Sequence, residues 1–320
     1  MSRRTDRLMA VALIGGAAVV TGMLALASLY LGIIGQAVSG IPRGEPLPEY
    51  DGRPAAPSAG GVQPQNYLIL TVDADDALTA ALVGHLSAGR ERLDLVALPT
   101  NLKVVARRDA GALTLGELWA DHPASLLQGV ESLLDVRMDH QVVVSVPRVP
   151  ALIDAVGGLS SDGTAGMTAV TVAAKSGGSP PPPDRGLATY LTADEPVLRL
   201  ERTTAVLSAV VARLAEGAVL SDSSRLERVT TVLIDCLTVD EGLTPEAARQ
   251  TALGFRFGGG SFATTPIPVA RAELEDGVVV LVPDPAELAQ LRDALKSDTV
   301  AGFTLTRPEA WDWLRSLPTR

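Results

Sequence analysis

The stretch YLILTVD, residues 67–73, is a short apolar run rich in strand-forming residues, and it ends on a carboxylate. A run of this kind predicts a buried strand. Two similar runs follow, LDLVAL at 93–98, which Pro99 stops, and QVVVSV at 141–146. Residues 76–88 are also apolar, and their pattern leaves a strand and a helix open.

Helical patterns are interleaved with the strands. We expect helices over 115–134, 149–156, 197–216, 223–237 and 284–295, another that begins at Thr244, and a late strand over 277–282. Strands that alternate with helices favour layers of helices on both faces of a sheet. The sequence therefore predicts an α/β fold, a layered α-β-α domain with a mixed central sheet.

The N-terminal region predicts a membrane anchor. Residues 1–7 contain three arginines, and no charged residue occurs from Leu8 to Ile34. A helix of about 27 residues is about 40 Å long, which exceeds the ~30 Å hydrocarbon core of a bilayer. A cleaved signal peptide is the alternative, but its apolar region has only about 7–15 residues. Because positive residues stay on the cytoplasmic side, we expect a cytoplasmic N-terminus (1–7), a transmembrane helix (8–34) and an extracellular remainder on the cell membrane.

The outer part of the chain divides by composition. Residues 35–65 are rich in Gly, Pro, Ala and Ser, which is typical of a linker. We expect order to begin near Asn66, the extracellular domain to span 66–300, and residues 301–320 to form a C-terminal helix or tail.

Charge and composition exclude several classes of function. The formal net charge is −10, from 27 Lys and Arg against 37 Asp and Glu, so a broad basic surface for nucleic acid is not expected. Aromatic residues make up 3% of the chain, which argues against stacking platforms for single-stranded nucleic acid or sugars. The single cysteine, Cys236, excludes an intrachain disulfide and a Cys-rich zinc site.

An acidic cluster follows the first predicted strand. Asp73, Asp75 and Asp76 lie within four residues, at the strand end where layered α/β proteins place ligands. Mg²⁺ is commonly held through one or two carboxylates, so Asp73 and Asp75 are candidate metal ligands. The alternative is a solvated acidic turn that begins a helix, which the helix dipole favours.

A pair of arginines begins a long predicted helix. Arg199 and Arg202 are three residues apart, which places both guanidiniums on one helical face. Two such groups, together with the N–H groups of a helix N-terminus, can hold a phosphate. The alternative is ordinary ion pairing, because Glu195 stands four residues before Arg199.

The order of these segments resembles the LytR-CpsA-Psr family. The resemblance rests on YLILTVD (67–73), LVALP (95–99), VESLLDVRMDHQVVV (130–144) followed by LIDAVGGL (152–159), and VLRLERTTAVL (197–207). Members of that family are extracytoplasmic enzymes of Gram-positive cell envelopes. They transfer a glycopolymer from a polyprenyl-pyrophosphate carrier to peptidoglycan, usually with Mg²⁺. The resemblance implies that Asp73 binds the metal and that Arg199 and Arg202 grip the pyrophosphate as binding and catalytic residues.

Several charged and polar residues of the family's pattern are missing from this chain. Where the family has an arginine and an aspartate after the proline, this chain has Thr100 and Asn101. The family's "RxD" after the first strand falls near Ala77 and Thr79. The paired glutamines after the second arginine are replaced by Thr203 and Thr204. Losing one donor of this kind typically costs about 10²–10³ in rate. The sequence thus predicts a membrane-anchored protein that binds a polyprenyl-linked glycopolymer. It is either an enzyme that transfers the glycopolymer to peptidoglycan or an impaired pseudoenzyme that binds lipid-linked glycan or a partner protein. An unrelated anchored solute-binding domain is a third reading.

Overall fold

The computed structural model describes residues 39–56, 62–105, 111–158, 190–191, 195–215, 223–254 and 262–317. Within these ranges no helix has both the length and the apolar character needed to cross a membrane. The predicted span, 8–34, lies outside the described residues.

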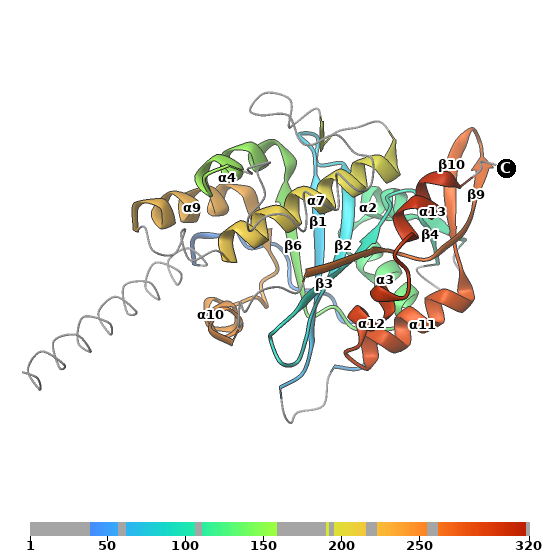
Figure 1. Ribbon diagram of the computed structural model, residues 1–320, viewed down its shortest axis with the longest axis horizontal. Coiled ribbons are helices and arrows are strands. Elements are labelled where there is room, and N and C mark those ends of the chain that lie inside the picture. Colours follow the sequence, from blue (N-terminus) through green and yellow to red (C-terminus); the bar gives the residue numbers. More distant parts are fainter. Residues whose placement is uncertain are drawn as a thin grey trace, which may run out of the picture.

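A six-stranded sheet forms the centre of the fold (Figure 1), with the strand order β7-β6-β1-β2-β3-β8. Its strands are β1 (Gln65–Val72), β2 (Leu78–Leu86), β3 (Leu93–Leu98), β6 (His140–Ser145), β7 (Leu237–Val239) and β8 (Phe262–Pro266). Strand β1 pairs in parallel with β6, and β3 with β8. The other neighbouring pairs are antiparallel, so the sheet is mixed, as the sequence predicts.

Strand β2 resolves the ambiguity over residues 76–88. All nine residues from Leu78 to Leu86 are buried, because β2 lies in the interior of the sheet between β1 and β3. A strand covered on both faces shows a continuous apolar run without the alternation that identifies a half-exposed strand. The helical reading of this segment is therefore wrong.

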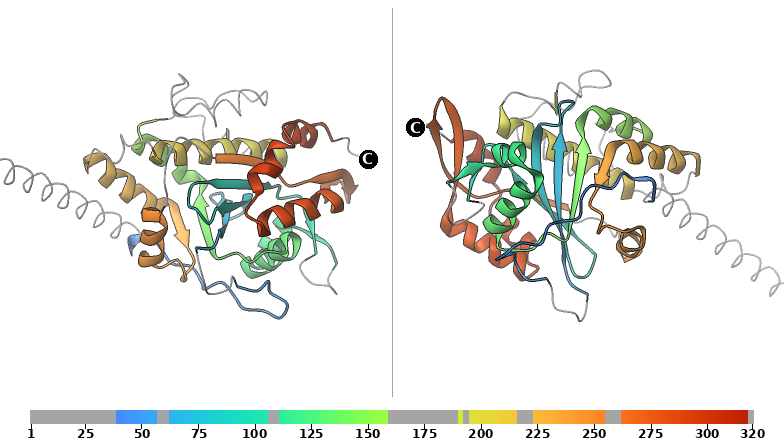
Figure 2. Two further views of the ribbon diagram at one scale, coloured as in Figure 1. Left: turned by 60° about the horizontal axis from the view of Figure 1, so that its bottom comes forward. Right: turned by 180° about the vertical axis from the view of Figure 1, so that it is seen from behind.

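Helices cover both faces of the sheet (Figures 1 and 2). Helix α7 (Pro196–Ala215) crosses one face, and α2 (Leu115–Asp121) and α3 (Pro123–Leu134) lie on the other. Helices α4 (Val149–Ala155), α9 (Ser223–Cys236) and α10 (Pro245–Gly254) lie towards the β6–β7 edge, and the 3₁₀ turn η1 (Val146–Arg148) joins β6 to α4. Thr114 begins α2 with a capping box that Glu117 completes, and such caps are worth about 1 kcal/mol.

Two apolar clusters fill the space between these layers. The larger one joins β1, β2 and β3 to α2, α3 and the C-terminal helices. The smaller one, here the second apolar cluster, lies between β6 and helices α4, α7 and α9. Its buried members are Val144, Val146, Val149, Leu152, Val156, Tyr190, Leu191, Val206, Val210, Val229 and Cys236.

The C-terminal elements belong to the main core. They are the hairpin of β9 (Val269–Glu275) and β10 (Val278–Pro283), then α11 (Pro285–Lys296), α12 (Val300–Leu305) and α13 (Ala310–Ser316); two short strands, β4 (Lys103–Val104) and β5 (Leu113–Thr114), lie beside the hairpin. Phe303, Trp311 and Leu314 are buried in the larger cluster. Residues 301–317 therefore complete the domain, whereas the sequence suggests a separate C-terminal helix or tail.

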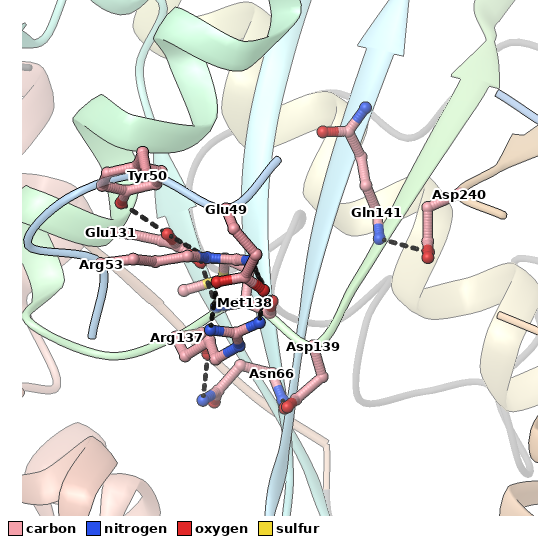
Figure 3. Close-up of polar contacts among 10 residues, drawn as sticks. All are labelled: Glu49, Tyr50, Arg53, Asn66, Glu131, Arg137, Met138, Asp139, Gln141 and Asp240. Carbon is pink, nitrogen blue, oxygen red and sulfur yellow. Dashed lines mark hydrogen bonds and ion pairs between the residues drawn. The ribbon is translucent and has the colours of Figure 1, made fainter. Parts of the chain in front are cut away.

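Residues 39–56, here the N-terminal strap, lie against the domain on the side of α2 and α3 (Figure 2). The Gly44 N–H donates to the carbonyl of Val239 at 2.8 Å, and Ile41 is buried against β7. At the other end of the strap, the Arg53 guanidinium and the Tyr50 hydroxyl bind Glu131 of α3 (Figure 3). The composition of 35–65 predicts a linker, but within 39–56 a few side chains fasten the segment to the domain.

Candidate functional site

The two candidate arginines lie in the first turns of α7. Arg199 and Arg202 are both half-buried, on the helix that covers one face of the sheet (Figure 1). Both lie within one helix, as the spacing requires, because α7 begins at Pro196, one residue before the predicted start at 197. The same face carries Val206 and Val210, two members of the second apolar cluster.

The backbone at the start of α7 is already capped. The Glu195 carboxylate accepts from the N–H of Val197 at 2.9 Å and from the N–H of Leu198. These are the N–H groups that the sequence analysis assigns to a phosphate. That part of the prediction is wrong, and any phosphate binding at this point depends on the guanidiniums.

Arg202 contacts an aromatic side chain at the border of the second apolar cluster. Its guanidinium lies 4.4 Å from the ring centre of Tyr190, and Nη1 donates to the Tyr190 carbonyl at 3.2 Å. Its Nε atom is buried and has no hydrogen-bond partner among the residues that the structure describes. Burial raises the pKa of Tyr190, and the positive charge of Arg202 opposes the shift. A buried donor without a partner is costly, so this position favours a ligand with an acceptor group.

A groove lies beside the same cluster, between α4 and α9. Its volume is about 570 Å³, and Ala155 and Val232, which pack against the second apolar cluster, form part of its wall. Arg225 and Arg228 also line it, and Asp154 is among its acidic lining residues. The groove thus combines apolar and charged groups close to the second apolar cluster.

The candidate metal ligands lie in the tight turn between β1 and β2. Asp73 Oδ1 accepts from the N–H groups of Asp75 and Ala77 at 2.9 and 3.0 Å, and Asp76 has a left-handed backbone with φ of 59°. The Asp75 side chain is exposed. The acidic segment is therefore a hairpin turn between antiparallel strands, and no helix begins there.

These residues are a poor match for a built metal site. Among the residues that the structure describes, no three His, Cys, Asp or Glu side chains are grouped to hold a metal ion. One oxygen of Asp73 stabilises the turn, and Asp75 faces solvent. The Mg²⁺ ion at Asp73 and Asp75 stays a prediction from the sequence, and we assign no step of a reaction to it.

Two uncharged residues at the family's charged positions, Thr79 and Asn101, have hydrogen-bond partners here. The Thr79 hydroxyl lies 2.7 Å from that of Thr71 and donates to the Thr71 carbonyl at 2.9 Å, and both side chains are buried. Asn101 is buried as well, and its amide donates to the carbonyl of Val279 in β10 at 2.9 Å. Neutral hydrogen bonds that hold strands together thus occupy this region.

Sequence reasoning missed Tyr190, because nothing in its sequence context marks it as a partner of Arg202. It also missed Glu131, a fully buried carboxylate. The available signal was weak: Glu131 interrupts an apolar helix pattern, and an acid at a buried helical position requires a cationic partner. The identity of that partner, Arg53, depends on the tertiary fold.

Comparisons with known proteins were made at the level of sequence and of structure. No family model matches the chain, and no curated protein sequence matches it significantly. Solved structures do match. TagT bound to LIIa-WTA superposes with a TM-score of 0.58 at 15% identity, over 78% of this chain and 96% of that one. A LytR-Csp2A-Psr enzyme from Actinomyces oris gives 0.55 at 16% identity, over 82% and 96%. An Enterococcus faecalis protein described as a transcriptional regulator gives 0.51 at 16% identity, over 80% and 95%.

These likenesses span most of both chains, while their sequence identities are low enough that they establish the fold alone. They agree with the resemblance carried by residues 67–73, 95–99, 130–159 and 197–207. The chain therefore has the fold of the LytR-CpsA-Psr proteins.

Proposed function

We propose that this protein is an extracellular, membrane-anchored component of cell-envelope assembly that binds a polyprenyl-pyrophosphate-linked glycopolymer. The observation that carries the proposal is the position of Arg202. Its guanidinium lies over Tyr190, which is itself a member of the second apolar cluster. A lipid phosphate has one apolar and one anionic part, and this border between an apolar cluster and a cation suits both.

The proposed roles of the residues follow from their positions. Arg202 would donate its Nε–H, which has no partner within the described part of the chain, to a pyrophosphate oxygen, and Arg199, one helical turn earlier, would contact the same group. The polyprenyl chain would enter along the groove between α4 and α9, beside the second apolar cluster. TagT, which has this fold, is known bound to LIIa-WTA, and that likeness supports a glycopolymer as the ligand of this chain.

Binding is better supported than transfer. Thr79 and Asn101 stand where the family's pattern has charged groups, and both are hydrogen-bonded within the domain. Few charges then remain to stabilise a leaving pyrophosphate, and such stabilisation usually makes the largest contribution to catalysis. Of the two readings of the sequence, these contacts favour the impaired pseudoenzyme. A role in binding nucleic acid is not proposed, because the chain is acidic, with a formal net charge of −10.

The test is native mass spectrometry of the full chain in detergent with a polyprenyl pyrophosphate. We expect Arg202→Ala to weaken binding about tenfold or more, because hydrogen bonds to charged groups contribute about 1.5–3 kcal/mol. Arg271→Ala is the matched control, since this arginine lies on the distant hairpin β9 in an ion pair with Glu273. Equal binding by both variants and the wild type would refute the proposed site.

A transfer assay separates the enzyme from the pseudoenzyme. The wild-type chain is incubated with a lipid-linked glycan and a peptidoglycan acceptor, with and without Mg²⁺. We expect product at the background level although the lipid binds. Turnover above background that Asp73→Asn removes would overturn the pseudoenzyme reading and support the metal role predicted for that aspartate.

A further inference from the structure

A cavity of about 340 Å³ lies on the face of the sheet opposite α7. It is enclosed by strap residues 44–48, by the junction of α2 and α3, and by strands β6 and β7. Its lining includes Trp119, His122, Gln141 and Asp240. The volume is within the range of small-molecule sites, about 300–1,000 Å³.

Two polar groups of this cavity have hydrogen-bonding capacity to spare. The side-chain amide of Gln141 makes no hydrogen bond to any residue that the structure describes, and Figure 3 shows it extending away from Asp240. The Nδ1 atom of His122 accepts from the N–H of Ala124 at 3.1 Å. The neutral ring therefore carries its hydrogen on Nε2, and that donor remains for a ligand.

Trp119 gives the cavity an aromatic wall whose orientation is fixed. Its Nε1–H donates to the carbonyl of Asp76 at 2.8 Å. This carbonyl belongs to the β1–β2 turn, where the N–H of Asp76 in turn donates to the carbonyl of Asp73. The ring thus has one fixed edge, and a single side chain connects the cavity to the turn that holds the candidate aspartates.

The charges of the lining restrict the class of ligand. Its charged side chains are Glu45 and Asp240, and no lysine or arginine occurs among the described residues that line it. Asp240 is 4% exposed, and its carboxylate accepts from the N–H groups of Gln141 and Leu243 at 2.9 and 3.1 Å. A phosphate or pyrophosphate would meet two carboxylates without a cation, so an anionic ligand is disfavoured here.

We propose that this cavity binds a neutral sugar unit of a glycan. One face of the ring would pack on Trp119, and its hydroxyl or acetamido groups would bond to Gln141 and His122. The low aromatic content of the chain argues against an extended stacking platform for a long glycan. A single sugar ring held in a cavity needs only one aromatic side chain to pack against. The proposal extends the function above, on which it rests, because it gives a neutral sugar of the cell-envelope glycan a binding site on the other face of the sheet from the lipid phosphate.

The experiment is isothermal titration calorimetry, which measures the affinity of the full chain in detergent for triacetylchitotriose, a neutral oligosaccharide. We expect Trp119→Ala to weaken binding about tenfold or more, as for other buried aromatic anchors. Gln141→Ala should weaken it about two- to tenfold, the range for a neutral hydrogen bond. The Gln141 variant also guards against misfolding, because that side chain makes no hydrogen bond within the described domain.

Trp313→Ala is the matched control. Trp313 also donates its Nε1–H to a backbone carbonyl, that of Val269 at 2.9 Å, and lines a second cavity of about 350 Å³ on the C-terminal side. We expect this variant to bind the sugar like the wild type. The proposal is overturned if the wild type does not bind, if Trp119→Ala binds as tightly as the wild type, or if Trp313→Ala loses as much affinity. Because polyprenyl pyrophosphate binding is measured separately, failure here leaves the lipid site intact.

Discussion

The buried ion pair between the strap and α3 is the contact most open to a quantitative test. Arg53 and Glu131 have side chains that are 3% and 0% exposed. The Arg53 Nε atom donates to both Glu131 oxygens at 3.2 and 3.0 Å, and Nη2 donates to Oε1 at 3.0 Å. Arg53→Met keeps the apolar stem of the side chain but removes every one of these donors. Glu131 would then be a buried carboxylate without its cation.

The expected loss is about 3–5 kcal/mol, the usual cost of breaking a buried pair by removing one partner. For a domain of this size, 1 kcal/mol corresponds to about 2–4 °C in Tm. Arg53→Met should therefore lower Tm by about 6–20 °C, measured by circular dichroism on the full chain in detergent. Arg271→Met, which removes an exposed pair with Glu273, should change it little, because exposed pairs contribute about 0–1 kcal/mol.

The double variant Arg53→Met/Glu131→Met distinguishes a lost charge partner from lost packing. Replacing both members of a buried pair with apolar groups is often neutral or stabilising. The double variant should therefore have a higher Tm than the single variant Arg53→Met. The reasoning is refuted if Arg53→Met and Arg271→Met have the same Tm, because the buried pair would then contribute nothing measurable to the stability of the fold. It is also refuted if removing Glu131 as well lowers Tm further.

Three other perturbations follow from the structure. A Cβ at Gly129 of α3 would lie 2.6 Å from the methyl of a buried leucine, whereas one at Gly302 of α12 would meet nothing within 4 Å. Gly129→Ala should thus lower the free energy of unfolding by about 1–3 kcal/mol through overpacking. Gly302→Ala should raise it by up to about 1 kcal/mol. Urea titrations that gave the opposite order of stability would contradict this. Burial raises the pKa of Cys236 to about 11, so iodoacetamide at pH 8 should label the native thiol on the order of 100-fold more slowly than a free cysteine, as mass spectrometry can check. Burial opposes ionisation of Asp240, but His140, whose Nδ1 lies 3.3 Å from Asp240 Oδ2, and the backbone N–H donors outweigh it and hold its pKa below the usual 3.8. Its stabilising effect is therefore complete above that value and lost as pH falls through the folded pKa, so Tm curves of the wild type and Asp240→Asn should converge on acidification and separate again above pH 4.

The parts of the fold that the sequence reveals are those with a local cause. The runs 67–72, 93–98 and 141–146 are apolar and short, and all three are strands. The helix that begins at Pro285 has Asp284 as its cap, which accepts from two backbone N–H groups. Such signals need only neighbouring residues, so they can be recognised before the fold is known.

The parts that escaped prediction have distant causes. Residues 39–56 look like a spacer because their attachment depends on Glu131, 78 residues after Arg53. The segment after the turn at Asp73 is a strand and not a helix. Because β2 is buried on both faces, its apolar residues follow no clear period, and the sequence pattern could not distinguish the two. Of the candidate site, the positions of Arg199 and Arg202 on one face of α7 follow from their spacing. The capping of that helix by Glu195 and the contact with Tyr190 depend on side-chain geometry that spacing does not specify.

The strap also has a mechanical consequence. Along the chain, its contacts with the β7 region, made by Pro42, Arg43 and Gly44, come before the Arg53–Glu131 pair on α3. A pull applied at Ser39 would load the edge strand β7 first, because that attachment comes first along the chain. The hydrogen bonds of Pro42 and Gly44 with Val239 and the Arg43 contact with the Leu243 carbonyl would yield before the buried pair on α3 carried tension. Residues 44–48, which close the sugar cavity, would then be released while the domain stayed folded, so a load on the N-terminal end would open the cavity without unfolding the sheet.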